Sequence, residues 1–350
     1  MRRRTLTSLL IVLAFLAALG VALYLRSKAP PEAARLLPES DAIVYVHLKT
    51  LRPVLHFDTA SEVRSPGLQH FIDATGIVPE RDLDAIAMGL HRVATPLPHQ
   101  PHAPVAEIFT SEVLVGRFDG QRLTHYLDSI ATARESYADR TIYTIPLDDQ
   151  SLRIAQLGYD TIGASNMPTS EQIHSMIDRS RASALSSPGS SLLAARYSEV
   201  PQLPFPPVAW GIGHIGLPFS QNGYVTVMGL QFPIPEDTDL VASLRYAGSA
   251  HLRVEEIAPD EDSAKHTAET VTTLLNILRN IGSEQARFAS TSDPSAAAMR
   301  NILGSATIEQ HGDRAILDAS ANGDQIKAIA SAAHPAAPDA TPVPASSSNH

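Results

Sequence analysis

Hydrophobic and polar residues follow one another along residues 36–333 in patterns that predict a mixed α and β chain. Short β-branched, apolar runs predict strands, and apolar residues spaced three and four apart predict helices. The strands expected in the first half are 42–48, 83–91, 112–118, 141–145, 152–157 and 161–164. Helices are expected at 67–75, after Asp119, and from Glu171, where Thr169-Ser170-Glu171-Gln172 has the form of a capping box.

A similar order of elements recurs in the second half. The expected strands are 208–215, 224–232, 239–246, 251–257, 307–310 and 315–319. A long helix is expected after Pro259, ending at Gly282, and a last helix begins at Asn322 with Gln325 at its third position. The sequence therefore predicts an α+β fold with two related domains, each an antiparallel sheet with helices on one face.

One apolar run is longer than a core element requires. Leu6 to Leu25 contains no charged residue, and such a segment rises roughly 30 Å as a helix, which matches the hydrocarbon core of a bilayer. Arginines at 2–4 precede the run, whereas only Arg26 and Lys28 follow it, so the N-terminus is expected in the cytoplasm. We therefore expect a single-pass anchor in the inner membrane, contacting the bilayer through residues 6–25, with the main part in the periplasm.

A cleaved signal peptide is the alternative for this segment. Ala18-Leu19-Gly20 has the small-x-small form of a peptidase site, although cleavage there would leave an unusually apolar new terminus. Either interpretation exports the remainder of the chain.

The composition between the apolar runs gives the expected domain boundaries. Pro, Ala and Ser are concentrated near the anchor, in the middle of the chain and at its end. The expected parts are an anchor (1–28), a linker (29–35), a first α+β domain (36–184), a Pro/Ser-rich linker (185–207), a second α+β domain (208–333) and a disordered tail (334–350).

Charge and cysteine content exclude several kinds of function. The chain has a formal net charge of −10, and residues 1–28 are basic without any acidic residue, so the exported part is more acidic still. Such a surface argues against nucleic acid as a partner. The chain has no cysteine, which excludes disulfides, thiol catalysis and a lipid-modified cysteine.

Three groups of residues have a superficial likeness to ligand sites. Gly211-Ile212-Gly213-His214-Ile215-Gly216 matches a dinucleotide-binding pattern, but no helix is expected after it, so a closely packed strand is favoured. His91, His99 and His102 lack a third ligand type nearby, so a solvated loop is favoured over a metal site. A dense acidic group is better explained by capping of the long helix than by calcium; its members are Glu255, Glu256, Asp260, Glu261 and Asp262.

Two further features are expected to be structural. Asp148 and Asp149 fit a turn between strands. Trp210, the only tryptophan, is expected in the second core, with ligand stacking as the alternative. The nucleophile elbow, the Ser-x-x-Lys motif and the zinc-protease motif are missing from the sequence.

The first domain resembles a class of uncharacterised bacterial envelope proteins that begin with a membrane anchor. The resemblance rests on Leu37-Pro38 and Asp41, Thr75-Gly76-Ile77, Arg81-Asp82-Leu83-Asp84 and Gly116-Arg117-Phe118-Asp119. It implies the anchored topology and the fold, and no functional residue, because the class has no established activity.

These observations support three hypotheses about function, with no catalytic residue, cofactor or metal expected. The leading hypothesis is a membrane-tethered, non-enzymatic binding or scaffolding protein of the cell envelope with a protein partner, acting through loops at Thr95–Pro104 and Gly216–Asn222. The second is a carrier or chaperone for an apolar ligand such as a lipid. The third is an envelope hydrolase whose Ser, His and Asp residues are dispersed in the sequence.

Overall fold

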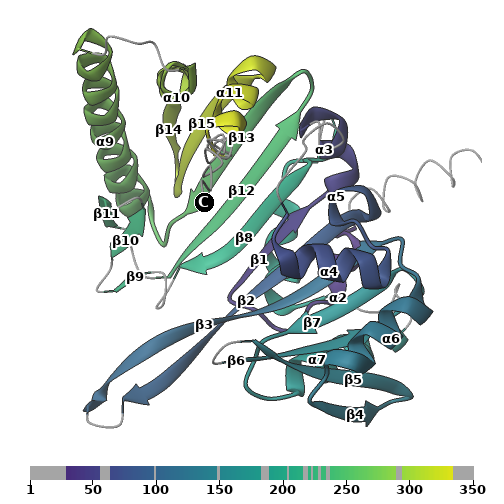
Figure 1. The fold of residues 1–350 in the computed structure, drawn as a ribbon. Helices are drawn as coiled ribbons and strands as arrows, with labels where there is room; N and C mark the ends of the chain where they lie inside the picture. The colour runs from purple at the N-terminus through teal and green to yellow at the C-terminus, as the bar shows by residue number, and fades with distance from the viewer. Residues whose placement is uncertain are drawn as a thin grey trace, which may run out of the picture.

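The protein has an α+β fold built around one large antiparallel sheet, as the computed structural model shows (Figure 1). The structure describes residues 29–55, 64–97, 100–147, 150–182, 189–202, 205–215, 220–221, 224–227, 230–233, 237–288 and 294–333. Twelve strands form the main sheet in the order β14-β15-β13-β12-β8-β1-β2-β3-β7-β6-β5-β4, and a small sheet has the order β11-β10-β9. The expected α+β class with antiparallel pairing is confirmed.

Most of the strands lie close to the positions that the β-branched, apolar runs predict. Their bounds are β1 Ala42–Val46, β2 Leu83–Leu97, β3 Gln100–Gly116, β4 Ala133–Tyr137, β5 Arg140–Leu147, β6 Gln150–Gln156, β7 Thr161–Ser165, β8 Ala209–Ile215, β9 Ser220–Gln221, β10 Tyr224–Val227, β11 Leu230–Pro233, β12 Thr238–Tyr246, β13 Ser249–Ile257, β14 Thr307–His311 and β15 Arg314–Asn322. Among them, β4 has no counterpart in the sequence prediction, because its residues are mostly exposed and carry no apolar alternation. The two-residue β9 falls in the loop expected at Gly216–Asn222, and the one strand expected at 224–232 is two strands, β10 and β11.

The helices include several short ones that periodicity does not reveal. Their bounds are α2 Glu32–Leu36, α3 Leu48–Leu55, α4 Pro66–Thr75, α5 Pro79–Asp82, α6 Gly120–Ile130, α7 Glu171–Arg181, α8 Ser191–Arg196, the 3-10 helix η1 Tyr197–Glu199, α9 Glu261–Phe288, α10 Pro294–Ser305 and α11 Gly323–Ala333. Helices of one or two turns contain too few residues for a helical period to be recognised.

Side chains at the helix starts explain several of the bounds. Asp119 Oδ1 accepts hydrogen bonds from the backbone N–H groups of Gln121 and Arg122 at the start of α6. Asn322 and Gln325 exchange two such bonds at the start of α11, as expected. The capping expected from Ser170 is wrong, because its hydroxyl donates to Glu135 instead.

The two halves of the chain meet at one strand pair in the middle of the sheet. β1 and β8 pair antiparallel, with Val44 opposite Gly211. Outward from this pair, β2 and β3 follow on one side, and β12 and β13 follow on the other. In the chain, helix α6 follows β3 and helix α9 follows β13. Each half then continues with antiparallel strands, and the last of them, β7 or β15, pairs with β3 or β13 respectively. The expected separate sheet for each half is therefore wrong, because β1–β8 pairing joins them.

Alternate residues of the strands point to opposite faces of the sheet and pack into two hydrophobic cores. Ala87 and Val113 belong to the larger core with Met176 of α7, whereas the neighbouring Leu114 packs into a second core with Leu123 of α6. The first half thus carries helices on both faces. This corrects the expectation of one covered face, because β2 and β3 have apolar residues on both sides.

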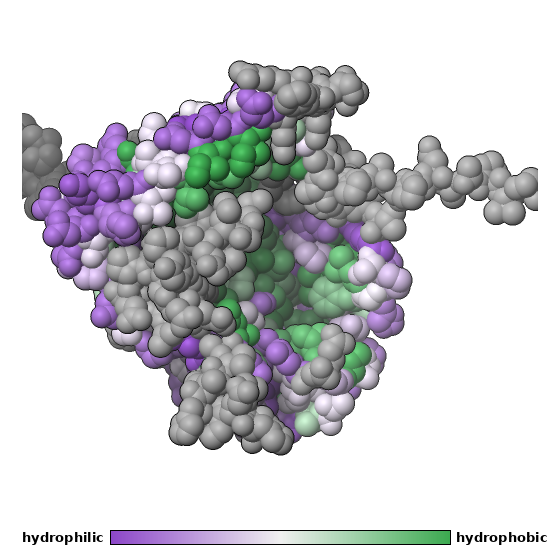
Figure 2. Space-filling view, turned by 90° about the vertical axis from the view of Figure 1, so that its left-hand side faces the viewer, coloured by the Kyte–Doolittle hydropathy of each residue, from purple (hydrophilic) through white to green (hydrophobic). Residues whose placement is uncertain are grey.

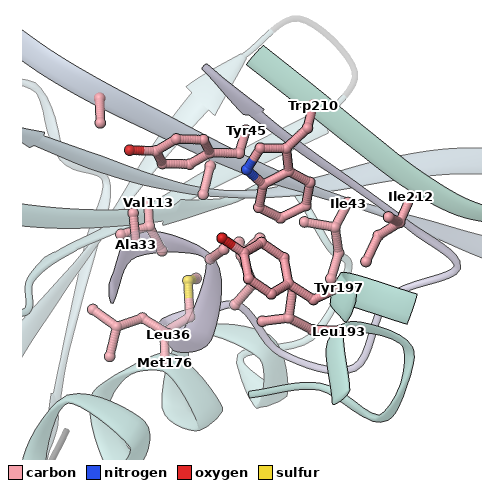
Figure 3. Packing of buried hydrophobic residues seen from close by; sticks show 14 of the residues in the cluster. Ala33, Leu36, Ile43, Tyr45, Val113, Met176, Leu193, Tyr197, Trp210 and Ile212 are labelled. Atoms are coloured by element: carbon pink, nitrogen blue, oxygen red, sulfur yellow. The ribbon is translucent and has the colours of Figure 1, made fainter. Parts of the chain in front are cut away.

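The larger core includes residues from both halves of the chain and surrounds Trp210 (Figure 3). The Trp210 ring stacks on Tyr45 with centroids 5.6 Å apart, and Tyr197 meets it edge-on at 5.3 Å. Trp210 is 3% exposed, so its expected burial is confirmed. Leu193 and Val200 are buried in the same core.

Two segments expected to be linkers contribute to this core. Ala33 and Ala34 of α2 are buried, although residues 29–35 were expected to be a spacer. In the described part of the linker expected at 185–207, residues 191–199 form α8 and η1, and Leu193, Tyr197 and Val200 are buried. Burial of these side chains, which local composition does not reveal, holds both segments against the sheet.

A third expected loop, Thr95–Pro104, is mostly strand. Thr95 pairs with Val105 and Leu97 with Gln100 at the end of a long β2–β3 arm, which extends beyond the rest of the sheet at the lower left of Figure 1. Only two strands form this arm, so each has a free edge where a proline needs no N–H partner. The prolines therefore do not prevent pairing.

The long helix also extends beyond its expected end, since α9 continues past Gly282 to Phe288. Within the described residues, no helix has both the length and the apolar character needed to cross a bilayer. The expected anchor (6–25) and the expected tail (334–350) lie outside those residues.

Candidate functional site

An apolar hollow lies on one face of the sheet, over the strands where the two halves meet. Its volume is about 250 Å³. The lining residues come from β1, β2, β8, β12 and β13: Ala42, Ile43, Val44, Leu90, Gly211, Ile212, Gly213, His214, Leu240, Ala242 and Val254. Figure 2 shows a recess on this side of the molecule with hydrophobic residues inside it.

The register of the strands explains why these residues come together. Val254 is opposite Ala242, Ala242 is opposite Gly211, and Gly211 is opposite Val44. Residues that lie directly opposite each other in an antiparallel pair share a face, so they form one apolar row across four strands. Leu240, Gly213, Ala42 and Leu90 form the next row.

Small residues on β8 and its neighbours create the depth of the hollow. A Cβ atom at Gly211 would meet Ile43 O at 3.6 Å and Val44 Cγ2 at 3.8 Å, which are ordinary contacts. A Cβ atom at Gly213 would lie 3.0 Å from the Ala42 side chain, so close strand packing requires glycine there. Gly211 and Gly213 thus lie in a strand, as expected, and Gly216 lies outside the described residues. The two glycines also form the floor of a hollow that the sequence gives no reason to expect.

The helices on this face lie to either side of the hollow. Leu123 and Leu127 of α6 cover Ile162 of β7 on one side. On the other side α9 packs over β14 and β15, and Thr267 of α9 donates a hydrogen bond of 3.1 Å to Glu256 Oε1 on β13. The central strands therefore keep a partly exposed apolar strip between two helical layers.

Glu256 is the acidic side chain next to this strip. It lies opposite Leu240, and Val254 is two residues before it on the same strand. Burial raises the pKa of Glu256 to about 7, although the hydrogen bond from Thr267 favours the ionised form. Glu256 is therefore a neutral carboxylic acid in slightly acidic solution.

The acidic group expected near the start of the long helix does not form one cluster. Glu255 and Glu256 point to opposite faces of β13, as neighbours in a strand do. Glu255 accepts a 2.5 Å hydrogen bond from Arg314, which also donates to Glu199 at 2.9 Å. Asp260 accepts from the backbone N–H of Ser263, which is the expected capping role.

Of the three histidines of the metal hypothesis, only His91 has a described side chain. His91 is buried with its Nε2 2.8 Å from Ser111 Oγ, and burial lowers the pKa of this imidazole while the nearby Asp41 partly offsets the effect. The side chains of His99 and His102, like Asp148 and Asp149, lie outside the described residues. In the described part of the chain, no group of three or more His, Asp or Glu residues could hold a metal.

Among the described residues, serine and histidine pair at two places, and histidine pairs with a carboxylate in His214–Asp239, His174–Glu135 and His311–Glu309. Besides His91 and Ser111, Ser249 Oγ lies 2.8 Å from His251 Nε2, whereas His214 Nδ1 lies 2.8 Å from Asp239 Oδ1. Ser170 and His174 both bond to Glu135, so there the carboxylate lies between the serine and the histidine. Among the hydrogen bonds of the described residues, no histidine bonds to both a serine and a carboxylate, which is the order that a catalytic triad needs. The hydrolase hypothesis gains no support from them.

Comparison with known proteins gives no family for this chain. No protein-family model matches it, and no curated protein matches it. Three solved structures have a similar course of the chain: crystal forms III, I and IV of TP0453, with 9%, 8% and 10% sequence identity and TM-scores of 0.47, 0.43 and 0.42. They cover 86%, 87% and 88% of this chain and 99%, 98% and 98% of their own.

Proposed function

We propose that this chain is a membrane-tethered, non-enzymatic binding protein that holds a lipid acyl chain in the apolar hollow. The observation that carries the proposal is the hollow itself, about 250 Å³ in volume and lined, apart from His214, by apolar residues of five strands. Burying apolar surface of a ligand there is favourable by about 25 cal/mol per Å².

The position of the hollow favours a hydrocarbon chain over a peptide. β2, β1, β8, β12 and β13 are interior strands, and each pairs with a neighbour on both sides. Their backbone groups are therefore occupied by the sheet, and a peptide laid on them would leave its own buried N–H and C=O groups without partners. A hydrocarbon chain carries no such groups.

The expected anchor supports the same ligand. Residues 6–25 would keep the protein at an inner membrane, where acyl chains are the most abundant apolar molecules. A reporter enzyme fused after residue 29 tests this topology: activity confined to the periplasm supports it, and activity confined to the cytoplasm contradicts it.

Photo-crosslinking tests the ligand with the full chain in its own membrane. Cells take up a fatty acid that carries a diazirine, the membranes are irradiated, and cross-linked peptides are mapped by mass spectrometry. We expect cross-links in β1, β8 and β12. Cross-links confined to residues 6–25, or cross-links from the hollow to a protein, would contradict the proposal.

A matched pair of variants makes this experiment specific. Gly211→Leu fills the floor of the hollow and should abolish its cross-links, while Gly304→Leu adds the same side chain to α10, where no atom lies within 4 Å of a Cβ at that position. Gly304→Leu should therefore cross-link like the natural chain.

A protein partner is the second candidate, and the β2–β3 arm favours it. The parts of β2 and β3 that do not pair with β1 or β7 form a two-stranded arm, and Ile108 near the base of this arm is 48% exposed. Such an arm offers two free strand edges to another chain. Replacing residues 95–104 by a two-residue turn should remove partners captured by chemical cross-linking of envelopes; unchanged capture would contradict this role.

We also propose that the two halves arose by duplication, as two domains that now share a sheet. The matching order of β1-β2-β3-β7 and β8-β12-β13-β15 outward from the central pair supports it. Superposition of these two sets of four strands, with their helices, tests the proposal.

A further inference from the structure

Glu256 lies at the border of the hollow, beneath the first turns of α9. It is 4% exposed and lies between Leu240 of β12 and Ala315 of β15, which are directly opposite it. Leu240 and Val254, its neighbours on the same face, both line the hollow. Glu256 therefore lies between the first turns of α9 and two lining residues of the hollow, although the lining itself includes no residue of α9.

Only one of the two carboxyl oxygens of Glu256 is hydrogen-bonded where it meets α9. Thr267 Oγ1 donates to Oε1, whereas Oε2 is buried and has no hydrogen-bond partner among the described residues. A neutral carboxyl group tolerates this position far better than a carboxylate does, because a buried charge without partners has lost its hydration.

The charged groups around this contact do not compensate a carboxylate. The residues opposite Glu256 on β12 and β15 are apolar, and on α9 the charged neighbours of Thr267 in sequence, Lys265 and Glu269, are exposed together with His266. The cations Arg253 and Arg314 interact with Glu255, which points to the opposite face of β13.

Only the first turns of α9 are buried against the sheet. Ala264, Thr267 and Ala268 are buried, and these small side chains permit close approach to β13 and β15. From Glu269 to Glu284 the described side chains are partly or fully exposed. The part of the helix that is buried on the sheet is therefore a short segment with Glu256 beneath it, whereas further along α9 Arg279 donates hydrogen bonds to the backbone carbonyl groups of Leu303 and Ala306.

We propose that α9 is a pH-dependent gate at the side of the hollow. Neutral Glu256 keeps the first turns of α9 packed on the sheet, and ionised Glu256 releases them and widens the hollow toward β13 and β15. The role in ligand access rests on the proposed function, whereas the movement of α9 requires no ligand.

The direction of the pH dependence follows from the raised pKa. The packed state favours the protonated acid, so this contribution to the packing of α9 is complete below the ordinary pKa of 4.5 and is lost as the pH rises through about 7. Between pH 4.5 and about 7 each pH unit makes the packed state about tenfold less favourable relative to the released state. Above about pH 7 the ratio no longer changes, because Glu256 is then ionised in both states.

Hydrogen exchange of the full chain in lipid nanodiscs tests the gate. Between about pH 6 and pH 8, after correction for intrinsic exchange, the amides of residues 264–272 should lose about tenfold in protection. The amides of β1 should keep theirs. Unchanged protection of α9, or an equal loss in β1, would overturn the proposal.

Three variants separate the carboxyl group from other causes. Glu256→Gln should keep α9 protected at both pH values, and Glu256→Leu provides the same test if the amide variant does not fold. Glu269→Gln, which neutralises an exposed acid on α9, should retain the natural pH dependence. The same pH dependence in all of these variants would contradict the gate.

Hydrogen exchange and the fatty-acid photo-crosslinking, taken together, distinguish the gate from the proposed ligand. Loss of α9 protection with pH, in a chain whose hollow gives no cross-links to the fatty acid, would support the gate and contradict the ligand. Cross-links in the hollow, with α9 protection that does not change with pH, would support the ligand and contradict the gate.

Discussion

Two glycines of β8 differ in what surrounds them, and the difference bears on both packing and the hollow. Gly213 is in close contact with Ala42, whereas Gly211 has ordinary contact distances on all sides. The sequence pattern gives them equal weight. Only the positions of the neighbouring strands separate a glycine needed for packing from one that leaves open space.

Valine substitutions at the two positions should therefore have opposite effects. Gly211→Val should raise the free energy of unfolding by about 0.5–1 kcal/mol, because glycine inside a strand costs conformational entropy. Gly213→Val should lower it by about 1–3 kcal/mol, because its Cβ overpacks against Ala42. Urea unfolding followed by circular dichroism measures both, and equal effects would contradict the assignment of the two sites.

Arg314 forms ion pairs on the face of the sheet opposite the hollow. It donates to Glu199 of η1 and to Glu255 of β13, and the side chain of Glu255 is only 9% exposed. Arg314→Met leaves that buried carboxylate without this partner. We expect a loss of about 2 kcal/mol in unfolding free energy, less than for a fully buried pair because Arg314 is one-third exposed.

The pH dependence of this effect has a definite sign. The hydrogen bond from Arg314 holds the pKa of Glu199 below its ordinary value of 4.5 despite partial burial. The stability it contributes is present above pH 4.5 and is lost as the pH falls through the lowered pKa. The difference between the natural chain and Arg314→Met should therefore shrink in acid. A constant difference from pH 3 to pH 7 would contradict the ion pair as its cause.

Among the elements, α8 and η1 show how a short segment can be structural despite its composition. Ser190 Oγ accepts from the backbone N–H of Leu193 and caps α8, and Leu193 and Tyr197 enter the larger core. Arg196 pairs with Asp239 and Glu199 with Arg314, so the segment is bound to the second half of the chain as well.

Leu193→Ala should consequently destabilise the protein by about 3 kcal/mol, because Leu193 is fully buried and its truncation leaves a cavity. Leu192→Ala, next to it and only partly buried, should cost clearly less. Chemical unfolding of both variants provides the comparison. Equal and small effects would support a flexible linker in this segment.

At the scale of the whole molecule, the two halves should unfold together. The larger core joins Ile43 and Ile142 of the first half to Ile212, Val241 and Ile257 of the second half. Because the two halves share one core and one continuous sheet, neither half would keep a complete core if the other half unfolded.

Trp210 gives a direct measurement of this cooperativity, because it is the only tryptophan and lies in the shared core. Its fluorescence and the far-ultraviolet circular dichroism should follow one coincident transition in urea. Two separated transitions, with fluorescence following only one of them, would show that the halves are independent domains.

Local sequence determined the class of most elements and the burial of many side chains. The apolar, β-branched run of β1, the helical spacing of Ile173 and Ile177 in α7, and the Asn322–Gln325 cap all depend on residues close together in the chain. Such patterns can be recognised from the sequence because strand and helix periods are local properties.

The tertiary structure alone decided the joining of the halves through β1 and β8, the packing of α8, and the hollow. Val44, Gly211 and Val254 meet through strand pairings between residues far apart in sequence, and pairing of this kind has no local signal. The burial of Glu256 has the same origin, because its surroundings come from β12, β15 and α9. The sequence by itself specified which side chains were available, and long-range strand pairing decided which of them share a site.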